Sequence, residues 1–99
     1  MKIYNQIKLA QELIRFPTVK TEDKGIMKFL SRKLSSIGFK CKIIKSKGIG
    51  QKPALNLYAK YGNSKLHINF LGHTDVVANL NNWKIPPFKG VVRKGYLNG

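Results

Sequence analysis

The stretch IGFKCKI, residues 37–43, is the point where the hydrophobic period of this sequence changes. Before Gly38, apolar residues recur every three or four positions, which is typical of amphipathic helices. After Gly38 they alternate with lysines, which is typical of a half-buried strand. Gly38 itself stands where a glycine commonly ends a helix. The sequence therefore predicts helices on the N-terminal side of this stretch and strands on its C-terminal side.

Two helices are predicted upstream, over residues 3–16 and 22–37. Pro17 ends the first helix, and Thr21 is the predicted N-cap of the second. Each helix carries an apolar stripe at helical spacing. The stripes are Ile3, Ile7, Ala10 and Ile14 in the first, and Ile26, Phe29, Leu30, Leu34 and Ile37 in the second.

Alternating patterns predict strands over residues 39–43, 55–60 and 66–70, and a hairpin over residues 91–97. Two N-terminal helices followed by strands indicate an α/β fold with a mixed sheet. The last strand has no obvious partner within the 99 residues, and an unpaired strand is a liability. We therefore expect an incomplete piece of a larger domain that is marginally stable alone.

Length and composition exclude several classes of protein. Ninety-nine residues allow one small domain at most, and 42% apolar residues are enough for a core. No run approaches the roughly 18 apolar residues of a membrane helix, and the N-terminus lacks the apolar stretch of a signal peptide. The single cysteine, Cys41, cannot form an intrachain disulfide. These features favour a cytoplasmic protein.

The net charge of +15 raises the alternative of a small basic module that binds nucleic acid. However, sixteen of the nineteen basic residues are lysines, and they are spread from Lys2 to Lys94 without a block. Lys, Ile and Asn are residues that AT-rich coding sequence favours, so base composition accounts for much of the charge. A dedicated nucleic-acid binder more often uses arginine in a compact patch. Nucleic acid is therefore not the favoured partner.

The segment FLGHTD, residues 70–75, carries the candidate site, because an apolar strand ends there and a loop begins. In extended backbone, residues two apart point to the same side, so His73 and Asp75 can face one site. A neutral imidazole is a good zinc ligand, and a nearby carboxylate can fix its tautomer. Gly72 would let the backbone turn sharply or approach another segment closely. The competing interpretation is a histidine and an aspartate in an ordinary polar loop.

Other chemically capable residues have simpler interpretations. His67 alternates with the core-facing residues of its strand and is predicted to face solvent. Cys41 lies on the apolar face of a strand and is predicted to be a small core residue. Trp83 and Phe88, close to two prolines, are predicted to anchor a loop by packing.

Taken as motifs, these segments resemble a known family. They are LGHTDVV (71–77), Trp83, PPF (86–88) and GYL (95–97), together with LIRFPTV (13–19), IGF (37–39) and NLYA (56–59) upstream. In this order they resemble the beginning of the succinyl-diaminopimelate desuccinylases, members of the zinc-dependent aminoacylase and carboxypeptidase clan. The resemblance covers essentially the whole chain.

The resemblance implies a two-zinc amidohydrolase, with cobalt as an alternative metal, that hydrolyses N-succinyl-diaminopimelate to succinate and diaminopimelate. This reaction serves lysine and cell-wall biosynthesis. By resemblance, His73 is a zinc ligand and Asp75 is the catalytic aspartate that orients it. Residues 1–99 would be the N-terminal part of a zinc-peptidase-like catalytic domain. The rest of that domain and the dimerisation domain are absent.

The departures from the family limit what this chain can do alone. Asn98 replaces a tyrosine, the loop between Val77 and Trp83 is short, and the metal-bridging aspartate and the Glu-Glu pair are missing. Glu12 and Glu22 match no family motif. We therefore expect the isolated chain neither to hold zinc tightly nor to hydrolyse an amide. A complementing C-terminal chain would be needed to act on the N-succinyl amino acid substrate, and a decayed remnant is the other alternative.

Overall fold

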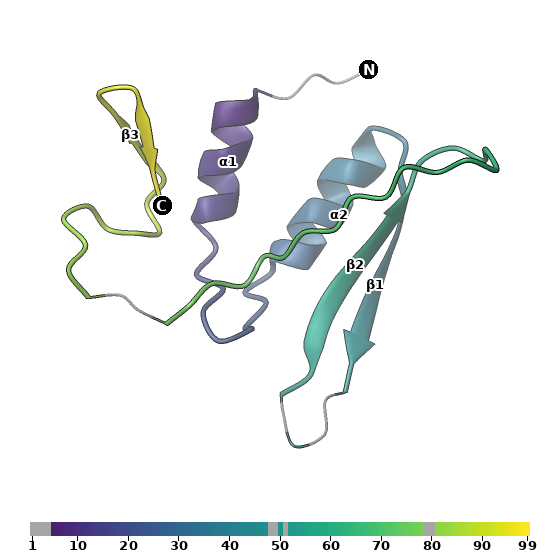
Figure 1. Ribbon diagram of the computed structural model, residues 1–99, viewed down its shortest axis with the longest axis horizontal. Coiled ribbons are helices and arrows are strands. Elements are labelled where there is room, and N and C mark those ends of the chain that lie inside the picture. The colour runs from purple at the N-terminus through teal and green to yellow at the C-terminus, as the bar shows by residue number, and fades with distance from the viewer. Residues whose placement is uncertain (1–4, 48–49, 51, 79–80) are drawn as a thin grey trace.

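A computed structural model describes residues 5–47, 50, 52–78 and 81–99. Two helices come first in the chain, and two short hairpins follow them (Figure 1), which confirms the α/β class. The helices are α1 (Gln6–Ile14) and α2 (Ile26–Ser36). The strands are β1 (Lys40–Ser46), β2 (Ala54–Lys60), β3 (Val91–Arg93) and β4 (Tyr96–Asn98).

Helix α1 is shorter than the predicted range of 3–16. Asn5 is its N-cap, and the Asn5 side-chain oxygen accepts a hydrogen bond from the backbone N–H of Lys8 at 3.1 Å. This bond satisfies one of the N–H groups that a helix start leaves unpaired. The helix ends at Ile14, ahead of Pro17. Residues 3 and 4 of the predicted range lie outside the described residues.

Helix α2 begins four residues later than predicted, and Thr21 is not its N-cap. Lys20, Thr21 and Lys24 adopt left-handed backbone, with φ of 54°, 62° and 52°. The chain therefore turns instead of starting a helix at residue 22. The Asp23 carboxylate accepts hydrogen bonds from the N–H groups of Gly25 at 2.9 Å and Met27 at 3.3 Å. Asp23 performs the capping function that the sequence pattern assigned to Thr21.

The switch at Gly38 is confirmed. Gly38 has a φ of +102°, which a side chain rarely adopts, and a Cβ there would lie 3.1 Å from the Tyr61 ring. The chain then enters β1, which pairs antiparallel with β2 from Lys40 opposite Lys60 to Ser46 opposite Ala54. Phe39 and Tyr61 flank this hairpin with their ring centroids 5.3 Å apart. Helix α2 packs along the hairpin (Figure 1).

The predicted third strand and the mixed sheet do not form. The structure contains two separate two-stranded sheets, β1–β2 and β3–β4, and both are antiparallel. Residues 66–70 form an irregular extended segment whose side chains are exposed, and its trace overlaps α2 in the view of Figure 1. A strand needs a neighbour for its backbone N–H and C=O groups, and no described residue supplies one here. Among the described residues, the one parallel pairing is an isolated bridge between Val19 and Val76.

The core of the described chain is small. Ile26 and Met27 are its buried apolar residues, and the Phe16 and Phe29 rings pack beside them with centroids 5.1 Å apart. The accessible surface is 8638 Å², whereas a folded protein of 11.2 kDa exposes about 5,700 Å². The radius of gyration is 15.6 Å, compared with about 13 Å for a compact domain of this length. This chain therefore leaves much apolar surface uncovered.

The predictions for four other single residues have mixed outcomes. His67 is exposed, as predicted. Cys41 is half-buried and therefore only partly a core residue. Phe88 is half-buried, which fits a loop anchor, whereas Trp83 is 46% exposed and packs less than predicted.

Candidate functional site

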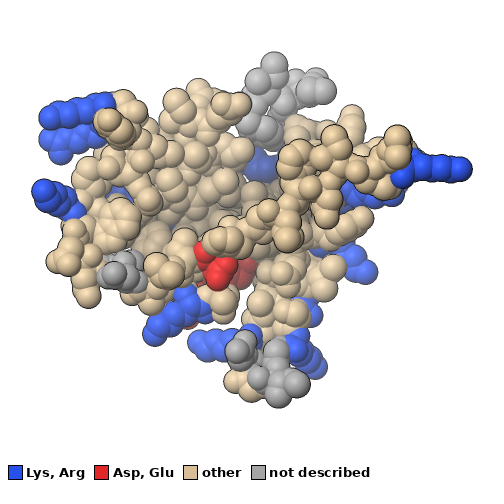
Figure 2. All heavy atoms as spheres, viewed as in Figure 1, with Lys and Arg blue, Asp and Glu red and all other residues tan. Residues whose placement is uncertain are grey.

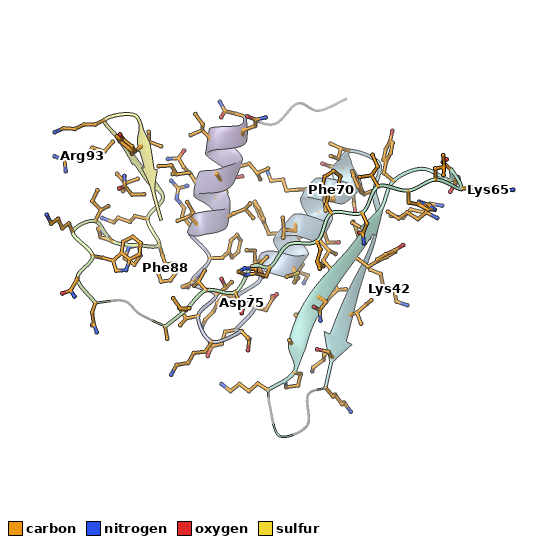
Figure 3. All side chains as sticks on the ribbon, viewed as in Figure 1. Lys42, Lys65, Phe70, Asp75, Phe88 and Arg93 are labelled. Atoms are coloured by element: carbon orange, nitrogen blue, oxygen red, sulfur yellow. The ribbon has the colours of Figure 1, made fainter. Side chains whose placement is uncertain are left out.

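His73 and Asp75 lie together on the segment that follows residues 66–70, near the connection between α1 and α2 (Figure 3, where Asp75 is labelled). The Nδ1 atom of His73 is 3.3 Å from Asp75 Oδ1 and 3.1 Å from the Asp75 backbone carbonyl oxygen. The predicted juxtaposition of the two side chains is therefore present. Both contacts of the ring are to the same residue, so Asp75 supplies the hydrogen-bond acceptors that orient the imidazole in this structure.

The two contacts define what the imidazole can offer to a ligand. With its hydrogen on Nδ1, the ring donates to Asp75 and leaves the Nε2 lone pair available. Such an arrangement, a histidine whose second nitrogen is held by a carboxylate or carbonyl, is common among metal-ligating histidines. The His73 side chain is 85% exposed and that of Asp75 50%, so the pair is open to solvent.

The backbone around this pair is fixed by a residue from the α1–α2 connection. Thr18 is 2% exposed. Its Oγ1 donates a hydrogen bond to the Thr74 carbonyl at 2.5 Å, and its own carbonyl accepts one from Val76 N–H at 3.1 Å. These bonds lie beside the Val19–Val76 bridge. Thr18 thus holds the residues on either side of Asp75.

Sequence reasoning did not find Thr18. It is one polar residue in the connection between Pro17 and the second helix, and nothing in the hydrophobic period distinguishes it. The only signal was its place within LIRFPTV, which contributed to the family resemblance. Burial of a threonine within a connection depends on a segment almost sixty residues away, which local pattern does not report.

Gly72 does not have the conformation that its position suggested. Its φ is not in the left-handed region, and a Cβ built on it would meet no atom within 4 Å. Within this structure the backbone at Gly72 neither turns sharply nor approaches another segment.

The described residues do not by themselves fit a zinc ion. A catalytic zinc takes about three protein ligands and a water. Across residues 5–47, 50, 52–78 and 81–99, no three His, Cys, Asp or Glu side chains gather closely enough to hold one ion. His73 and Asp75 provide at most a part of such a site.

The two glutamates near the N-terminus are engaged elsewhere. Glu12 pairs with Lys33 at 3.5 Å, and Glu22 pairs with Lys24 at 2.7 Å and Lys52 at 3.8 Å. The hydrogen bond from Lys24 and its positive charge hold the pKa of Glu22 below its ordinary value. Both carboxylates therefore form ion pairs with lysines in this structure.

Among the described residues, neither the charges on the face shown in Figure 2 nor a shallow hollow defines a second site. On the face shown in Figure 2, lysine and arginine side chains project around the periphery, and acidic atoms form one small patch near the centre. A shallow hollow is lined by Glu12, Arg15, Phe16 and Phe29, none of which belongs to the His73 segment. Within the described part of the chain, neither helix has the length and apolar character needed to cross a membrane.

Comparison with known proteins gives relatives along the whole chain, although no protein-family model matches it. A protein of Pelagibacter ubique (strain HTCC1062) is 50% identical over 100% of this chain and 26% of its own length. A protein of Anaplasma marginale (strain Florida) is 39% identical over 100% of this chain and 26% of its own length. One of Ehrlichia canis (strain Jake) is 43% identical over 94% of this chain and 25% of its own length. All three are named succinyl-diaminopimelate desuccinylase, and the chain spans about a quarter of each.

Proposed function

Along its whole length this chain is a homologue of the succinyl-diaminopimelate desuccinylases, and we propose that it supplies the His73–Asp75 part of such a hydrolase. The 50% identity across the full chain is the observation that carries the proposal. Its length, about a quarter of the relatives, is consistent with an N-terminal fragment.

The proposed reaction is hydrolysis of the amide of N-succinyl-diaminopimelate. Water adds to the amide carbonyl carbon, the C–N bond breaks, and succinate and diaminopimelate are released. His73 would contribute one ligand, through Nε2, to a zinc or cobalt site. Asp75 would accept a hydrogen bond from Nδ1–H and keep Nε2 directed toward the metal. The other ligands would come from the part of the relatives that this chain does not span.

The alternatives receive less support. A nucleic-acid-binding module does not explain the similarity to desuccinylases along the whole chain. The lysines are also distributed around the surface instead of forming one patch on the face of Figure 2. A decayed remnant remains as one outcome of the following experiment.

The test is a chimera in which residues 1–99 replace the matching quarter of the Pelagibacter ubique relative. We expect the zinc-loaded chimera to release succinate from N-succinyl-diaminopimelate, and the 99-residue chain alone to release none. Asp75→Asn should lower kcat/KM by about 10- to 100-fold, as loss of a ligand-orienting carboxylate does. His73→Ala should cost more, because it removes a ligand.

His67→Ala is the matched control, since it removes the only other imidazole of the chain from an exposed position. It should leave kcat/KM unchanged. A folded, metal-loaded chimera without activity, beside an active relative, would contradict the proposal and indicate a decayed remnant. Metal-dependent turnover by the 99-residue chain alone would contradict the expectation that the other metal ligands come from outside this chain.

A further inference from the structure

Thr18 is the one buried polar residue among those the structure describes, at 2% exposed. Burying a hydroxyl costs free energy unless it is hydrogen-bonded. The Thr18 hydroxyl meets this requirement by donating to the Thr74 carbonyl, across 56 residues of sequence. The position of this bond, directly before Asp75, connects Thr18 to the candidate site.

The hydrogen bonds of Thr18 bracket a single residue. Its Oγ1 binds the carbonyl of Thr74 at 2.5 Å, and its carbonyl binds the N–H of Val76 at 3.1 Å. Both bonds join residues 66–77 to the α1–α2 connection, beside the Val19–Val76 bridge. The peptide groups on both sides of Asp75 are therefore fixed by one residue of the α1–α2 connection.

We propose that Thr18 is a positioning residue that sets the orientation of Asp75 and, through it, the hydrogen-bonding state of the His73 ring. His73 Nδ1 approaches both the backbone carbonyl and the carboxylate of Asp75, at 3.1 and 3.3 Å. One acceptor belongs to the Asp75 backbone and the other to its side chain, so a displacement of the Asp75 backbone moves the carbonyl and the point from which the carboxylate extends. The ring, which is 85% exposed, has no packing that would keep it in place.

The chemical consequence is a choice of tautomer. While Asp75 keeps this orientation, its backbone carbonyl oxygen and its Oδ1 atom both favour a hydrogen on His73 Nδ1. Nε2 then carries the free electron pair. The value of this tautomer for metal binding rests on the proposed function. The coupling between Thr18 and the ring does not, and it can be measured on the 99-residue chain without metal or substrate.

The test is ¹⁵N NMR of the two histidine rings at about pH 8, where most imidazoles are neutral. His67, exposed and on the same extended segment, is the internal reference. We expect His73 to be enriched in the Nδ1–H form relative to His67. Thr18→Val keeps the branched shape and removes the hydroxyl. It should lower the ratio of the Nδ1–H to the Nε2–H form of His73 toward the ratio found for His67.

Amide exchange gives a second readout at Val76. Thr18→Val removes the bond from the Thr18 hydroxyl to the Thr74 carbonyl and keeps the backbone bond from Val76 N–H to the Thr18 carbonyl. Loss of the first bond should loosen the second and speed exchange of the Val76 N–H by about 2- to 10-fold. Thr18→Ser retains the hydroxyl and should restore both readouts. Thr21→Val is the matched control, because the Thr21 hydroxyl binds only the neighbouring Lys20 carbonyl. It should leave the His73 ring and the Val76 amide unchanged.

The outcomes separate this proposal from the proposed function. Equal tautomer ratios for His73 and His67 in the wild-type chain would overturn the positioning role, whatever the variants do. A shift in Thr18→Val that Thr18→Ser does not rescue would also overturn it. An inactive chimera with an ordered His73 tautomer would instead overturn the desuccinylase function and leave the coupling intact.

Discussion

The contact between His73 and Asp75 is too exposed to organise the loop that carries it. Ion pairs and hydrogen bonds between exposed side chains contribute about 0–1 kcal/mol, because water competes for both partners. The buried Thr18 bonds are better shielded from that competition. The backbone therefore positions the side chains of the site, and we expect substitutions of His73 or Asp75 to leave the stability of the chain almost unchanged.

The pairing of His73 with Asp75 could be predicted from the sequence, because two-residue spacing in extended backbone is a local property. The same local reasoning failed at Thr21 and Gly72. Asp23, and not Thr21, caps the second helix, because residues with left-handed backbone precede the helix and delay its start. A Cβ built on Gly72 would meet no atom within 4 Å, because close approach requires a second segment that the described residues do not place there.

Gly90 is the residue whose substitution tests how the C-terminal hairpin is attached to α1. It has a φ of +64°, and a Cβ there would lie 2.9 Å from the Gln11 carbonyl oxygen. The Gln11 amide also donates to the Gly90 carbonyl at 2.8 Å. Gly90→Ala should lower the free energy of unfolding by about 2–3 kcal/mol, because strain in the left-handed region adds to overlap with backbone. Urea unfolding followed by circular dichroism measures the loss.

Gly95→Ala is the control for Gly90→Ala. Gly95 has a similar φ of +80°, but a Cβ there would meet nothing within 4 Å. Only the backbone penalty should remain, about 1 kcal/mol. Equal losses for the two variants would show that the hairpin does not rest on α1 in solution.

The start of α2 is the clearest case in which one side chain determines where an element begins. Asp23→Ala removes the acceptor of the Gly25 and Met27 N–H groups and should destabilise the helix by about 0.5–2 kcal/mol. Asp23→Asn should lose little, because asparagine caps nearly as well. Faster amide exchange at Gly25 and Met27 in the alanine variant alone is the expected result. Equal exchange in both variants would contradict the capping role.

Helices and hairpins were predictable here because their hydrogen bonds close over short distances in sequence. The period of three to four residues identified α1 and α2, and the alternating pattern identified the β3–β4 hairpin. The segment 66–70 has an equally clear alternation. It did not become a strand because a strand also needs a partner from elsewhere, and the pattern of one segment cannot report whether that partner is present.

The chain as a whole combines two opposing properties, an uncovered apolar segment and a large positive charge. Leu66, Ile68, Phe70 and Leu71 are 85–98% exposed, and Figure 3 shows Phe70 on the segment between Lys65 and Asp75. Exposed apolar side chains on an unpaired extended segment favour association between chains. A net charge of +15 opposes association by mutual repulsion.

The balance between these properties should depend on salt in a defined direction. The screening length falls from about 30 Å at 0.01 M salt to about 8 Å at 0.15 M, so repulsion between chains weakens while apolar contacts do not. We therefore expect the weight-average mass in sedimentation experiments to rise with salt. Ile68→Lys should suppress the rise, because it places a charge among the apolar side chains. His67→Lys is the matched control, since it adds a lysine at the adjacent exposed position, and should retain most of the rise. A mass that falls as salt increases would show that ion pairs, and not the 66–71 segment, bring the chains together.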